Sequence, residues 1–173
     1  MNDGILKLAL LIFFLPLAAF AIMGVFNRRI PRRGDFLATG VIGVCLGLSL
    51  MVFVKAWRSP DPLMVDVSFN WLPMRHGLNL MGGLMVDRLT AVMLVVVTLV
   101  SFLVHLFSVK YMEGDVRYGR YYASLLLFTV SMLGLVLANN LLYLYIFWEL
   151  VGLSSYILIG HWYERKSASD AAV

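Results

Sequence analysis

Glu149 is the side chain in this sequence whose position is best suited to proton or ion chemistry. It lies inside the apolar stretch 140–160, directly after Trp148. A carboxylate at bilayer depth costs about 2.5–3.5 kcal/mol on insertion scales, so such a residue usually faces protein or water and has a function. Burial favours its neutral form and a nearby cation favours its ionised form. We therefore interpret Glu149 as a proton-transfer residue, with a neutral, hydrogen-bonded structural glutamic acid as the alternative.

A second candidate, His105, belongs to a polar stripe within the apolar stretch 84–107. The members of this stripe follow one another at steps of four and three residues: Asp87, Ala91, Leu94, Thr98, Ser101, His105 and Ser108. On a helix this spacing gives one slowly drifting line, which should face neighbouring helices or a water-filled path. Serine and threonine on such a line often serve only helix packing. An imidazole can also relay protons, so packing and proton relay both stay open for His105.

Five apolar segments are long enough to hold these residues in a membrane. They cover residues 5–26, 36–56, 84–107, 121–138 and 140–162. Each has roughly 18–24 residues, where about 20 are needed to cross the hydrocarbon core as a helix. The chain is 61% hydrophobic and only 14% charged, which is typical of a membrane protein. We predict an all-α, polytopic membrane helix bundle with about five transmembrane helices.

The first segment also has features of a signal peptide. Lys7 precedes its apolar core, and Ala19-Phe20-Ala21 resembles a cleavage site. Four arginines follow at once within residues 28–33, however, and these would oppose export. We therefore keep the segment as a membrane helix.

The distribution of basic residues predicts the orientation. They concentrate between the first two segments, between the third and fourth, and after the fifth: Arg28, Arg29, Arg32, Arg33, Lys110, Arg117, Arg120, Arg165 and Lys166. Positive residues mark the cytoplasmic side, so we predict an N-terminus outside the membrane.

The external loop 57–83 predicts a small β-hairpin between the second and third helices. Val65, Val67, Phe69 and Trp71 alternate with polar residues, as in a half-buried strand that Pro73 would end. Residues 78–85 would return as the second strand. An irregular loop on the membrane surface is the alternative.

Cofactor and metal sites are not expected in this chain. It has one cysteine, Cys45, and three histidines without metal-ligand spacing, and no glycine-rich nucleotide loop. We also expect no nucleic-acid partner.

Three segments carry a resemblance to a known family. Residues 148–163, which begin Trp-Glu-Leu-Val-Gly-Leu-Ser-Ser-Tyr, residues 103–112 and residues 86–93 closely resemble the antiporter-like subunit L of bacterial NADH–quinone oxidoreductase, respiratory complex I. The resemblance implies a proton-translocating membrane subunit that couples electron transfer from NADH to quinone to proton pumping and carries no redox centre itself. It implies other membrane subunits of the complex as partners, the subunit M type among them. It also implies a multi-pass protein of the bacterial inner membrane.

The resemblance further implies roles for the two candidate residues. Such subunits have inverted five-helix repeats with broken helices. In this family a glutamate on the fifth helix pairs with a lysine on the broken seventh, and Glu149 matches that glutamate. His105 matches a histidine often present in subunit L.

Members of this family are several times longer than 173 residues. We therefore expect an N-terminal fragment, with helices one to three in residues 1–120 and the first two helices of the antiporter-like repeat in residues 121–173. The pairing lysine would then lie beyond Val173. Two alternatives stay open: a subunit of a multisubunit cation/proton antiporter or membrane-bound hydrogenase, and a haem anchor that uses His105 and His161.

Overall fold

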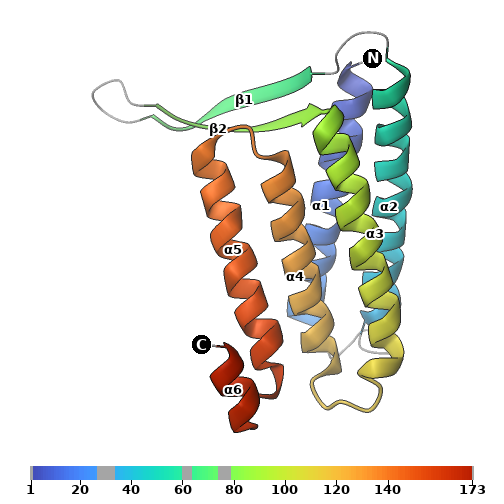
Figure 1. Ribbon diagram of the computed structural model, residues 1–173, viewed down its shortest axis with the longest axis vertical. Coiled ribbons are helices and arrows are strands. Elements are labelled where there is room, and N and C mark those ends of the chain that lie inside the picture. The colour runs from blue at the N-terminus through green and yellow to red at the C-terminus, as the bar shows by residue number, and fades with distance from the viewer. Residues whose placement is uncertain (1, 27–33, 60–63, 74–78, 173) are drawn as a thin grey trace.

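The computed structural model describes residues 2–26, 34–59, 64–73 and 79–172, and it contains five long helices (Figure 1). These are α1 (Asn2–Phe26), α2 (Asp35–Arg58), α3 (Arg88–Tyr111), α4 (Tyr118–Leu137) and α5 (Leu141–Ile159). All five are long and apolar enough to cross a membrane, which confirms the predicted helix bundle. A 3₁₀ turn, η2 (Gly160–Trp162), and a short helix, α6 (Lys166–Ala172), follow.

The centre of the bundle is α4. It packs against α1, α2, α3 and α5, and 61% of its most apolar stretch is buried. At Gly134 the absence of a side chain lets α5 approach closely, because the Phe147 ring of α5 lies directly against this glycine. By contrast, α5 packs along α4 at the edge of the bundle, and only 6% of its apolar stretch is buried. One long side of α5 is therefore not covered by any other described element.

The predicted hairpin is confirmed. Strands β1 (Met64–Pro73) and β2 (Asn79–Asp87) pair antiparallel, with Val65 opposite Val86 and Phe69 opposite Gly82. The hairpin runs across the end of the bundle that holds the N-terminus (Figure 1). Leu78, the predicted first residue of the second strand, lies outside the described residues.

The predicted start of the third membrane helix, Leu84, was wrong. Residues 84–87 extend β2, because their backbone pairs with β1. The helix α3 begins at Arg88, where Oδ1 of Asp87 accepts a hydrogen bond from the backbone N–H of Thr90 (2.6 Å).

The turn between α3 and α4 and the segment after α5 share the end of the bundle opposite the hairpin (Figure 1). Basic side chains occur in both, and the guanidinium of Arg117 in that turn binds the Glu164 carboxylate beyond α5 (2.7 Å). The four arginines between α1 and α2 lie outside the described residues. The arrangement places these two basic segments at the same end of the bundle, and an N-terminus outside remains our prediction.

Candidate functional site

Glu149 lies near the middle of α5, with its side chain on the exposed side of the helix. It borders a groove of about 700 Å³ whose other lining residues are Leu141, Leu142, Leu144, Tyr145 and Trp148. The Tyr145 phenol lines the same groove, one helical turn from Glu149. Within the described parts of the chain, no lysine or arginine forms an ion pair with Glu149. The groove therefore supplies one hydroxyl group and an apolar wall.

The helical face that continues from Glu149 is also uncovered. A Cβ built on Gly152 would meet nothing within 4 Å, and Tyr156 is 54% exposed. No helix among the described residues covers this face.

The hairpin and the α4–α5 corner fix the start of α5. Oδ1 of Asn140 caps the helix by accepting from the backbone N–H of Tyr143 (2.8 Å). The amide of Asn139 donates to Oδ1 of Asp66 (2.8 Å) and to the hydroxyl of Ser68 (2.9 Å), both on β1. On β2, Gly83 leaves no space for a side chain, because a Cβ there would collide with Asn139. These contacts position the helix that carries Glu149.

Along its length, α5 is held against α4 by an aromatic contact. The Phe147 ring lies against Gly134 of α4, where a Cβ would collide with it. The same ring packs edge-to-face on Phe13 of α1, with centroids 5.8 Å apart, and on Tyr143, at 5.9 Å. Phe147 and Glu149 are close neighbours on α5, so this contact sets the rotation of the helix and keeps Glu149 on the outer side.

His105 lies on the buried face of α3, and none of its surface is exposed. Its Nδ1 is 2.8 Å from the Ser101 carbonyl oxygen, so Nδ1 carries a proton and donates it to that oxygen. The other ring nitrogen, Nε2, is then a lone-pair acceptor, and it is buried without a hydrogen-bond partner among the described residues. This geometry presents a basic nitrogen inside the bundle.

Hydroxyl groups lie on both sides of His105 along the α3–α4 contact. The Thr129 hydroxyl donates to the Leu125 carbonyl (2.9 Å), so its oxygen accepts from the Ser101 hydroxyl (2.6 Å). One turn beyond His105, the hydroxyls of Ser108 and Tyr121 are 3.1 Å apart. The polar stripe predicted on this helix is its buried face, and it faces a neighbouring helix as expected.

The two predicted site residues are not brought together. His105 lies between α3 and α4, whereas Glu149 is on the outer side of α5. No contact joins them among the described residues. They form two separate polar positions in the bundle.

Sequence reasoning missed a polar cluster at the end opposite the hairpin. Oδ2 of Asp115 accepts from the Trp162 indole N–H (2.9 Å), and Oδ1 accepts from the Arg117 backbone N–H (2.6 Å). Nε2 of His161 is 3.5 Å from Oδ1. Burial raises the pKa of Asp115, but the Trp162 and Arg117 hydrogen bonds and the nearby His161 outweigh it, and the net pKa lies below its ordinary value. Trp162 is 47 residues from Asp115 along the chain, so no spacing signal could have revealed the cluster.

Two family models match the sequence. One, described as NADH-ubiquinone oxidoreductase (complex I), chain 5 N-terminus, covers residues 71–122. The other, described as NADH:quinone oxidoreductase/Mrp antiporter, TM, covers residues 138–173. Glu149 lies within the second segment and His105 within the first.

Curated relatives match nearly the whole chain. F(420)H(2) dehydrogenase subunit L of Methanosarcina mazei is 40% identical over 166 residues, which are 96% of this chain and 24% of that protein. NADH-quinone oxidoreductase subunit L of Neisseria meningitidis serogroup B is 41% identical over 175 residues, 99% of this chain and 25% of that protein. The chain thus spans about a quarter of the length of these relatives.

Two solved structures share the fold. A chain of the Mrp complex from Dietzia sp. aligns with a TM-score of 0.68 and 29% identity, over 88% of this chain and 16% of that chain. A chain of the membrane-bound sulfane sulfur reductase, an archaeal respiratory membrane complex, aligns with a TM-score of 0.78 over 95% of this chain and 32% of that one, at 19% identity. With five membrane-length helices and these relatives, this multi-pass membrane protein belongs to the family of antiporter-like subunits that includes subunit L and chain 5 of the NADH-quinone oxidoreductases.

Proposed function

We propose that this chain belongs to a proton-translocating subunit of NADH–quinone oxidoreductase, which couples electron transfer from NADH to quinone to proton pumping. The observation that carries the proposal is Glu149, an ionisable side chain in the middle of a membrane-length helix, beside a groove rather than in a packed core. A structural glutamic acid would be expected to lie inside the bundle with hydrogen-bond partners. Glu149 instead faces outward from it.

In this proposal Glu149 binds and releases the transported proton. Its described neighbours provide the Tyr145 hydroxyl but no cation, so the charge-stabilising partner comes from another part of the protein or from another subunit. Approach of a cation would favour the carboxylate and release a proton, and withdrawal would favour the neutral acid. The open side of α5 is where such a partner has room to approach.

His105 is proposed as a second proton-transfer position. Its Nε2 lone pair is buried, and hydroxyl pairs lie on both sides of it along the α3–α4 contact. A proton relay requires donors and acceptors arranged one after another in space, because each group passes a proton to the next. A proton path from His105 and these hydroxyl groups to Glu149 would run through groups outside the described contacts.

The chain itself carries no redox centre in this proposal. The other membrane subunits of the complex, a subunit M type among them, are its partners, and the bacterial inner membrane is its location. Its enzymatic role is therefore that of one subunit in a larger oxidoreductase.

Glu149→Gln tests the proposal, because it removes the titratable group with little change in shape. In the assembled complex we expect NADH-driven proton pumping to fall by at least about tenfold. A positioned proton-transfer group contributes about 10²-fold or more to the rate of a chemical step, and Gln cannot transfer a proton in this way. Pumping is measured by the quenching of a pH-sensitive dye in membrane vesicles, and assembly by native gel electrophoresis. Glu113→Gln, the same substitution at an exposed carboxylate in the turn between α3 and α4, is the matched control. Full pumping by an assembled Glu149→Gln complex would contradict the proposal.

A second candidate is a subunit of a multisubunit cation/proton antiporter or of a membrane-bound hydrogenase. The likeness to a chain of the Mrp complex, and the family model that names this antiporter, favour keeping it. Proton movement driven by a sodium gradient without NADH would support this candidate. Proton movement that requires NADH oxidation and is indifferent to sodium would support the first.

A further inference from the structure

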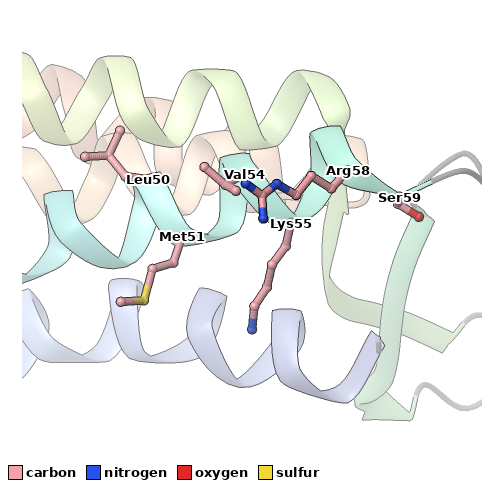
Figure 2. A pocket seen from close by; sticks show the side chains of 6 residues that line it. All are labelled: Leu50, Met51, Val54, Lys55, Arg58 and Ser59. Carbon is pink, nitrogen blue, oxygen red and sulfur yellow. The ribbon is translucent and has the colours of Figure 1, made fainter.

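A groove at the hairpin end of α2 combines apolar side chains with two cations (Figure 2). Its volume is about 500 Å³, and it is lined by Leu50, Met51, Val54, Lys55, Arg58 and Ser59. The three apolar side chains are between 43% and 57% exposed, so no described element packs over them. Lys55 and Arg58 are in the last turn of α2.

The cations of this groove differ from those at the other end of the bundle. There, Lys110 pairs with Glu113 and Arg117 with Glu164. In the described part of the chain, no carboxylate lies within ion-pair distance of Lys55 or Arg58. Among the described residues, the groove therefore has uncompensated positive charge.

A third cation, Arg88 at the start of α3, adds to this charge. Its guanidinium donates to the carbonyl oxygen of Ser59, at 3.1 Å, and so lies beside the end of α2. A ligand that complements this corner of the molecule is negatively charged.

Along α2 the groove has its cations in the last turn and its apolar side chains in the turns before it, which matches a molecule with one charged end and one apolar end. The last turn of a membrane-spanning helix lies at the level of the lipid head groups, whereas residues one or two turns earlier lie in the hydrocarbon. Lys55 points toward α1, where a Cβ on Gly4 would be 3.9 Å from its Nζ, and the Arg58 side chain folds back along α2 toward Val54 (Figure 2). One charge thus lies toward α1, and the other lies along α2 beside Val54.

We propose that this groove binds an anionic phospholipid of the leaflet at the hairpin end. The head-group phosphate lies between Lys55 and Arg58, and one acyl chain covers Leu50, Met51 and Val54. Basic pockets on membrane helices recognise anionic head groups in this way. The groove beside Glu149 serves as an internal comparison, because its described lining residues are also mostly apolar but include a carboxylate and no cation. The proposal does not depend on proton transfer.

The experiment measures lipid retention by the purified protein in nanodiscs. Phosphatidylglycerol is compared with phosphatidylcholine of the same acyl chains, and the lipid that stays bound is quantified by native mass spectrometry. We expect selective retention of phosphatidylglycerol. Lys55→Gln combined with Arg58→Gln should weaken its binding about fivefold per cation, on the order of 30-fold for both.

Two further variants separate charge from shape. Arg165→Gln combined with Lys166→Gln removes the same net charge at the opposite end and should leave retention unchanged. Leu50→Trp fills the groove while keeping both cations, and it should also lower retention. Soluble glycerol phosphate should not displace the lipid, because it lacks the acyl chain. Equal retention of the two lipids, equal loss in both double variants, or displacement by glycerol phosphate would overturn the proposal.

Discussion

Two carboxylates in this chain, Asp115 and Glu149, have opposite surroundings. Asp115 receives hydrogen bonds from an indole N–H and a backbone N–H, and an imidazole lies beside it. Such donors hold it in its ionised form. Glu149 lies on an exposed helix face, where the described lining residues of its groove supply one hydroxyl group, that of Tyr145. The first environment suits a fixed charge that joins two segments, and the second suits a group whose charge changes with an approaching partner.

The lowered pKa of Asp115 predicts a pH-dependent contribution to stability. Its ionised form is favoured by folding, so the contribution is present above the ordinary value of 3.8 and is lost as the pH falls through the lower folded-state pKa. Asp115→Asn should lower the free energy of unfolding by about 1–2 kcal/mol at neutral pH, because a hydrogen-bonded charge is lost. The difference from the unmodified protein should shrink in the acid range below 3.8.

Thermal unfolding of the purified protein across a pH series measures this difference. Glu113→Gln is the control, because that carboxylate is in the same turn but its side chain is 65% exposed, so its ion pair contributes little. A stability gap for Asp115→Asn that is as large in strong acid as at neutral pH would show that the charge is not responsible.

At the scale of elements, the packing of α5 on α4 depends on the absence of a side chain at Gly134. Gly134→Ala would push the Phe147 ring, which is also confined by Phe13 and Tyr143, and should destabilise the protein by about 1–3 kcal/mol. Gly152→Ala is the matched control, a helical glycine on α5 with nothing within 4 Å. The two variants are compared by thermal unfolding, and equal stabilities would mean that this contact does not hold α5 in place.

Local patterns in the sequence were sufficient to predict the membrane helices, the hairpin and the buried stripe of α3. The membrane helices have long apolar runs, the hairpin has an alternation with a period of two, and the stripe has steps of three and four residues. The start of α3 could not be found this way, because Leu84–Asp87 are compatible with both a helix and a strand, and their pairing with β1 decides. The contact between Asp115 and Trp162 likewise arises only when α3, α4 and α5 pack together.

Which face of α5 is exposed could not be predicted from the sequence either. The position of Glu149 in the helix was predictable, but its direction depends on which side of α5 packs on α4. That side is selected by the Gly134–Phe147 contact, which joins two helices. Whether Glu149 and His105 transfer protons stays a prediction.

At the scale of the whole molecule, the charge distribution predicts that the hairpin is outside the membrane and α6 is inside. The single native cysteine, Cys45, is fully buried, so introduced cysteines can report the orientation. Met64→Cys, at an exposed position of β1, should react with a membrane-impermeant maleimide added to intact cells. Ser167→Cys in α6 should react only after the membrane is permeabilised, and the reverse pattern would invert the topology.

The central position of α4 has a consequence for biogenesis. It has the lowest mean hydropathy of the five helices, 1.5 against 2.6 for α1 and α3, yet it is the most enclosed by protein. For α4 alone, transfer from the translocon into lipid would be only weakly favourable in free energy. The helices synthesised before it provide the surface that buries its hydroxyl groups, among them the one that binds Ser101. Membrane integration of α4 should therefore be cooperative, and a defect in an earlier helix would be seen first as a failure of α4 to leave the translocon.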